Sequence, residues 1–238
     1  MATLASMVLA ACGGDGQPTL GSSSAVANAS QLSNLDCDPV YQKGDTVTLH
    51  VYVQRPPQSP AMDEGLYTRT YSPATFLGTS LTQQIEKSAT NPVQSNLYYL
   101  VGNGARTYYG DESFVSGFLI AQNVYSRGYV ETIGLAGTES VNYVDEPVLP
   151  AGGYQTAISM QRTYVGRDTV SLKNGKTFNN ACHYRGAQTS SNAKTTETTT
   201  ADEWWAPGVG MVKTVADVGG LQIVTRELDS ATVAGKRY

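Results

Sequence analysis

The chain has few charged residues, few phenylalanines and only two histidines, and these shortages exclude several classes of protein. Charged residues make up 15% of the 238 positions and form no basic cluster, so a nucleic-acid-binding surface is not expected. No apolar run approaches the ~20 residues of a membrane-spanning helix. Glycine (24) and tyrosine (15) are abundant, as are threonine and serine, a mixture typical of half-exposed strands. We therefore predict a soluble all-β domain with little helix.

Strict alternation of apolar and polar residues is clearest over residues 44–54, where Val47, Leu49, Val51 and Val53 share one face of a strand. An Asn103-Gly104 pair predicts a tight hairpin, and residues 146–153 read as a loop. Short turns at regular spacing favour a strongly curved antiparallel meander, either an open barrel or half-barrel or a sandwich. Further strands are expected over residues 66–71, 76–87, 97–101, 106–109, 118–125, 129–134, 156–165, 169–172, 176–185, 195–205, 210–217 and 221–228.

The first residues read as a targeting segment. Residues 1–11 are small and apolar, end in Leu-Ala-Ala, and precede Cys12 and a Gly/Ser-rich stretch. Leu9-Ala10-Ala11-Cys12 resembles the lipobox of bacterial lipoproteins. The resemblance implies lipidation of Cys12, a membrane anchor and a place in the cell envelope, with the outer membrane favoured because Gly13 is not aspartate.

Two points about this segment stay open. The basic residues that usually precede such a stretch are absent, so the natural start either lies upstream of Met1 or has been trimmed. The alternative to lipidation is an incidental cysteine in an unstructured N-terminus. We divide the chain into a signal remnant (1–11), a lipidated cysteine with a flexible tether (12–35), one β domain (36–230) and a tail (231–238).

The two remaining cysteines predict a disulfide. Cys37 lies where the tether meets the domain, and Cys182 falls on the more apolar face of a predicted strand, with Phe178 and Tyr184. An oxidising compartment would favour a Cys37–Cys182 bond; the alternative is two free buried thiols. We read Asp36 and Asp38, which flank Cys37, as solvated linker charges. With no CxxC or HxxxH spacing, no metal site is expected.

The stretch Glu203 to Lys213 (EWWAPGVGMVK) carries the most distinctive motif of the domain. Pro207-Gly208 has turn chemistry, and Gly210 permits a close approach or a bulge. Trp204 and Trp205 are either a ligand-contacting aromatic pair or a structural hairpin cluster, and the structural interpretation is favoured. Lys213 closes the motif.

This motif, together with the Gly175-Lys176-Thr177-Phe178 turn, resembles a set of bacterial envelope lipoproteins that includes the TapB-like proteins and related domains of unknown function. The resemblance covers residues 155–228 and implies a curved, lipoprotein-carrier-like antiparallel sheet. It implies no activity.

We expect a non-enzymatic, lipid-anchored binding or interaction protein without catalytic residues or cofactors. Its partner would be a protein, a glycan or an apolar small molecule, and tyrosine-rich segments 98–109 and 125–129 motivate a recognition surface. A carrier predicts a concave face lined by Leu, Val, Ile and Met, whereas a pure interaction protein predicts a filled core. A second alternative is an envelope hydrolase, which would need a pair of Asp/Glu side chains converging in a cleft.

Overall fold

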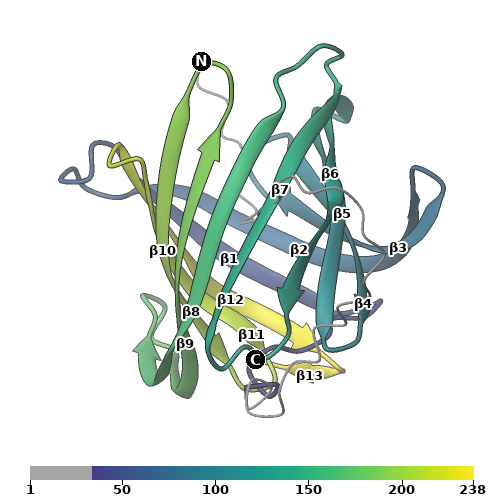
Figure 1. Cartoon of the computed structure of the whole chain (residues 1–238). Coiled ribbons are helices and arrows are strands. Elements are labelled where there is room, and N and C mark those ends of the chain that lie inside the picture. The colour runs from purple at the N-terminus through teal and green to yellow at the C-terminus, as the bar shows by residue number, and fades with distance from the viewer. Residues whose placement is uncertain (1–33) are drawn as a thin grey trace.

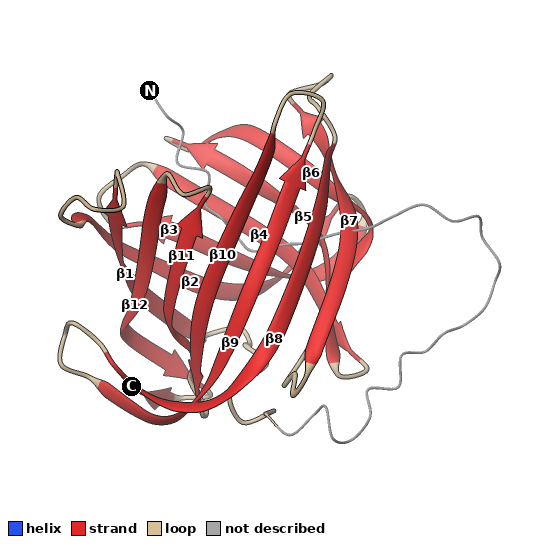
Figure 2. Cartoon of the chain, turned by 60° about the vertical axis from the view of Figure 1, so that its left-hand side comes forward, coloured by secondary structure: helices blue, strands red, loops and turns tan. Residues whose placement is uncertain are grey.

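The computed structural model describes residues 34–238, and these residues form an all-β structure without helix (Figure 1; Figure 2). No helix among them has the length and apolar character that crossing a membrane requires. The strands are β1 (Thr46–Gln54), β2 (Met62–Phe76), β3 (Thr79–Ser88), β4 (Val93–Gly102), β5 (Ala105–Val115), β6 (Phe118–Thr132), β7 (Thr138–Leu149), β8 (Thr156–Ser171), β9 (Thr177–Ser191), β10 (Thr196–Ala206), β11 (Gly210–Val218), β12 (Gln222–Val233) and β13 (Lys236–Arg237).

The sheet is a closed antiparallel barrel. Each strand pairs with the next one along the chain, and β1 also pairs with β12 over its whole length, from Thr46–Thr232 to Gln54–Ile223. The antiparallel meander was predicted correctly, but the open or half-barrel was wrong. Closure removes both edges, since β1 and β12 satisfy each other's backbone groups. Figure 1 shows the tilted strands arranged around a common axis.

The structure confirms the predicted hairpin turn and differs from the predictions at three other segments. Asn103 and Gly104 have φ of 52° and 74°, the two positive values that a tight hairpin between β4 and β5 requires. The two strands predicted over 118–125 and 129–134 form one strand, β6 (Phe118–Thr132), which pairs irregularly with β5. Much of the loop predicted at 146–153 belongs to β7. Residues 231–238 lie in the sheet, where Ala231 and Tyr238 exchange backbone hydrogen bonds.

Alternation along the strands determines which side chains face the barrel interior. On β1, Val47, Leu49, Val51 and Val53 are buried and their neighbours are partly exposed, as the sequence pattern predicted. In an up-and-down barrel alternate turns lie at opposite ends. The start of β1 and the turns after β4 and β10 therefore share one end, and the loops after β1, β3 and β11 share the other.

Residues 34–45 seal the first of these ends, and we call this segment the plug. Cys37 and Asp38 of the plug are almost fully buried. Asn34 Nδ2 donates to the Leu135 backbone oxygen at 2.9 Å, and the Tyr41 ring stacks on Tyr71 with centroids 4.5 Å apart. The barrel interior is therefore closed at one end by the chain's own entry segment.

Candidate binding cavity inside the barrel

The barrel encloses a cavity of about 470 Å³ between the plug and the opposite end. This size lies within the range of roughly 300–1,000 Å³ that small-molecule sites occupy. Aromatic rings, aliphatic side chains and two methionines line the cavity. The aliphatic residues and methionines include Val51, Val53, Val93, Leu97, Val115, Met160, Met211, Val218 and Val224. The interior is therefore not the filled core that a pure interaction protein would have.

One side of the cavity places valines directly beside an arginine. Val51 on β1 pairs with Arg226 on β12, and Val53 pairs with Val224, one step farther from the plug. Because cross-strand partners share a face, Arg226 and the three valines all face the interior. A charged level of the wall thus passes into an apolar level toward the unplugged end.

Arg226 belongs to a buried ion-pair cluster with Arg69 and Glu86. Arg226 Nη1 donates to both Glu86 oxygens at 2.8 and 2.9 Å, and Arg69 Nε donates to Glu86 Oε2 at 2.6 Å. Burial alone would raise the pKa of the Glu86 carboxyl, but the two guanidinium groups outweigh it and hold the pKa at about 2. Glu86 is therefore ionised throughout the physiological range.

A second ionic network lies at the floor of the cavity, against the plug. Arg106 donates to Asp38 of the plug and to Glu131 on β6, the latter at 3.4 Å. Arg162 donates to Glu131 at 2.9 Å and to Glu203 at 3.3 Å. The prediction that Asp38 is a solvated linker charge was wrong, since its side chain is 2% exposed. Its ion pair fixes the plug to β5.

Tyrosines cover part of this floor. Tyr108 stacks on Tyr129 with centroids 4.6 Å apart, and its hydroxyl donates to Glu131 Oε2 at 2.6 Å. Burial raises the pKa of the Tyr108 hydroxyl well above its usual value, and the Glu131 carboxylate raises it further, so the hydroxyl stays a donor. Tyr99, Tyr108 and Tyr129 line the cavity. These members of the predicted tyrosine segments face inward.

The turn at Pro207-Gly208 contacts the plug. Gly208 has φ of 73°, and its backbone N–H donates to the Asp36 carbonyl at 2.7 Å. Gly210 has φ of 89°, and a Cβ there would meet the Tyr41 hydroxyl at 1.9 Å. The motif glycines therefore admit the plug as well as turning the chain.

The two tryptophans do not form a pair, because neighbouring strand residues point to opposite faces. Trp204 stacks outside on His183, with centroids 4.6 Å apart. Trp205 faces inward and lines the cavity, and its Nε1 donates to Glu203 at 3.0 Å. Lys213 forms a 2.7 Å ion pair with Glu227 and is not among the residues lining the cavity. Of the candidate motif residues, Trp205 is the one that lines the cavity.

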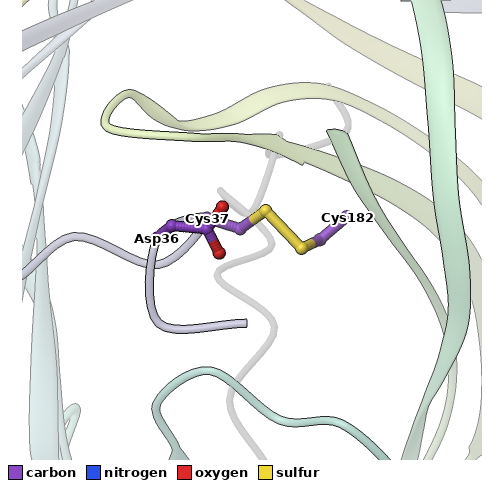
Figure 3. Close-up of side chains that lie close together, drawn as sticks. All are labelled: Asp36, Cys37 and Cys182. Atoms are coloured by element: carbon purple, nitrogen blue, oxygen red, sulfur yellow. A yellow bond between two sulfur atoms is a disulfide. The ribbon is translucent and has the colours of Figure 1, made fainter. Parts of the chain in front are cut away.

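Cys37 and Cys182 form a disulfide with Cα atoms 6.1 Å apart, so the predicted bond is confirmed in the structure (Figure 3). Asp36 lies beside the two sulfurs, and the three side chains together have a metal-like spacing. Because the sulfurs are bonded to each other, they offer no thiolate to a metal. The Asp36 carboxylate instead accepts hydrogen bonds from both terminal nitrogens of Arg167, at 2.7 and 2.9 Å. Cys12 and most of the predicted tether lie outside the described residues.

The acidic pair at the cavity, Glu131 and Glu203, is ion-paired to Arg162, and Asp111 and Asp145 are a further pair of mostly buried carboxyls. The Asp111 carboxylate accepts hydrogen bonds from Tyr125 at 2.6 Å and Asn123 at 3.2 Å. Burial, together with the smaller effect of the Asp111 carboxylate, raises the pKa of the Asp145 carboxyl to about 7. Neither carboxyl is among the residues that line the cavity. Neither pair therefore carries a catalytic proposal.

The shifted pKa of Asp145 makes stability depend on pH. Its folded value of about 7 exceeds the ordinary value of 3.8, so the folded state binds the proton more tightly. This contribution is fully present below about pH 4 and is lost as the pH rises to about 7. We expect Asp145→Asn to be more stable than the parent at pH 8, by on the order of 2 kcal/mol, and similar to it at pH 4.

Urea unfolding at pH 4 and pH 8 measures this difference. Glu197→Gln, which neutralises an exposed carboxylate on β10, is the matched control and should change neither value appreciably. If the free energy of unfolding depended on pH equally in Asp145→Asn and the parent, the pKa of Asp145 would not be raised in the folded state.

The interior charges were not identified as site residues from the sequence, although a signal was present. Arg69 follows Tyr67 by two positions, Glu203 lies between Ala201 and Trp205, and all of these occupy the buried phase of their strands. A charge in the buried phase of a strand indicates an interior ion pair or a ligand contact.

No family model matches the chain, and no curated protein matches it. Two solved structures are similar to it in outline. One is a protein provisionally described as a lipoprotein from Parabacteroides distasonis ATCC 8503, with 12% identity, a TM-score of 0.37, and coverage of 79% of this chain and 95% of the other. The second is a provisionally described exported protein with YmcC-like fold from Bacteroides fragilis NCTC 9343, with 11% identity, a TM-score of 0.37, and coverage of 82% and 98%. The TapB-like resemblance stays a prediction.

Proposed function

We propose that this chain is a non-enzymatic binding protein of the bacterial cell envelope that holds a small molecule inside its barrel. The observation that carries the proposal is the cavity of about 470 Å³, which is lined by apolar and charged side chains and closed at one end by the plug. The apolar part of the wall favours an apolar chain or ring, because binding removes the apolar surface of both the ligand and the wall from water.

The envelope location rests on two features. The Leu9-Ala10-Ala11-Cys12 lipobox would anchor the chain to a membrane through Cys12, and the Cys37–Cys182 disulfide suits an oxidising compartment.

Filling the cavity should abolish binding. Ala216 lines the cavity on β11, and Ala216→Trp would place an indole in the ligand's space. Its neighbour Val215 faces outward, opposite Asp202, so Val215→Trp adds the same ring on the other face and is the matched control. We expect the uncharged dye N-phenyl-1-naphthylamine to fluoresce with the parent and with Val215→Trp, and about tenfold less with Ala216→Trp.

Fluorescence titration measures this contrast, with circular dichroism to establish that all three proteins fold. Absence of dye binding to the folded parent would contradict the proposal. Equal binding by Ala216→Trp and Val215→Trp would also contradict it, because the dye would then lie outside the barrel.

A further inference from the structure

Two arginines share one carboxylate at the cavity wall. Arg69 and Arg226 both line the cavity and both bind Glu86, whose side chain is 4% exposed. Within residues 34–238, Arg69 reaches an acceptor through Nε, and neither of its Nη atoms hydrogen-bonds to a protein acceptor. Arg226 donates to Glu86 through Nη1, and its other nitrogens donate to no acceptor in the described residues. The cluster therefore carries one more positive than negative charge and keeps guanidinium donors unused.

The rest of the interior has the opposite balance. In the second network, Arg106 and Arg162 face four carboxylates, those of Asp38, Glu131, Glu139 and Glu203. An anion entering the cavity is repelled from that side and attracted to the Arg69–Arg226 side. Glu64 also lines the cavity, but it lies one position beyond Gly65, which pairs with Val51, and thus toward the unplugged end.

The apolar wall continues directly from Arg226, whereas Arg69 pairs with Val47, nearer the plug. Val51 lies beside Arg226 in register, and Val53 and Val224 form the next level toward the unplugged end. A guanidinium group binds oxyanions through a planar fork of N–H donors. A molecule with an oxyanion head on the Arg69 fork would therefore lay its chain along these valines.

We propose that the ligand is an amphipathic anion, an apolar chain that ends in a carboxylate or similar oxyanion, whose head binds Arg69 and Arg226. This inference rests on the proposed function, since it requires the cavity to take up a ligand. It adds the sign of the ligand's charge and the position of its head.

Three ten-carbon probes that differ only in their heads test the inference: decanoate, 1-decanol and decylammonium. Each is titrated calorimetrically into the parent protein. We expect decanoate to bind at least tenfold more tightly than 1-decanol, because charge-assisted hydrogen bonds are the strong ones, and decylammonium to bind most weakly.

Arg69→Met removes the surplus charge while Glu86 keeps both hydrogen bonds from Arg226. We expect it to lose about tenfold in decanoate affinity and to keep its affinity for 1-decanol. Arg185→Met, which removes an arginine that is 64% exposed, is the control and should bind all three probes as the parent does.

The outcomes separate the two proposals. Equal affinity for decanoate and 1-decanol, or preference for decylammonium, overturns the anionic head and leaves the binding cavity standing. A preference for decanoate that survives Arg69→Met overturns the assignment of the head to this cluster. If none of the probes binds, the amphipathic anion is rejected, and the uncharged-dye titration with Ala216→Trp decides separately whether the cavity binds anything.

Discussion

Replacing Cys37 and Cys182 together by alanine is expected to lower the free energy of unfolding by about 5 kcal/mol. The bond joins residues 145 positions apart, and in the chain-entropy model a loop of this length restricts the unfolded chain strongly. It also fastens the plug to β9, so the variant should lose order in residues 34–45 first. Urea unfolding followed by circular dichroism measures the change.

Cys12→Ala is the control, because it removes a cysteine without opening the disulfide. It should unfold as the parent does, and adding a reducing agent to the parent should reproduce the Cys37→Ala/Cys182→Ala result. Two titratable thiols in the unreduced, unfolded Cys12→Ala protein would contradict the disulfide. So would a double variant as stable as the parent.

The second large effect is expected from Arg106→Met. Its guanidinium lies between Asp38 of the plug and Glu131 of β6, and all three side chains are at least nine-tenths buried. Removing one partner of a buried ion pair leaves uncompensated charge and costs about 3–5 kcal/mol.

Arg185→Met separates this effect from simple loss of an arginine. Arg185 pairs with Asp202 on the outer surface, where an ion pair contributes about 0–1 kcal/mol. Urea titrations of both variants measure the difference. A loss for Arg106→Met as small as that for Arg185→Met would contradict the buried network.

Local sequence patterns predicted much of the sheet because they depend on nearby residues. The period of two on β1 assigned Val47 to Val53 to one buried face, and the Asn103-Gly104 turn required positive φ that few other pairs supply. Cys37 and Cys182 could be paired because no other cysteine remained within the predicted domain. These inferences needed no knowledge of which strands are distant neighbours.

Closure and the charged interior could not be predicted in the same way. Alternation shows which face of β1 is buried, but the partner of its free edge, β12, lies at the other end of the chain. Asp38 looked like a linker charge because its partner Arg106 is far away in sequence. Trp204 and Trp205 were considered together, although a strand must separate them onto two faces. Each of these features depends on contacts between distant segments.

A crystal structure of the chain with a brominated decanol, whose bromine is located by anomalous scattering, tests most directly whether the barrel holds a ligand. We expect one bromine peak inside the barrel, among Val51, Val53 and Val218, and no such peak in Ala216→Trp. A peak confined to the outer surface, or a barrel without bromine at saturating probe, would contradict a ligand-binding cavity.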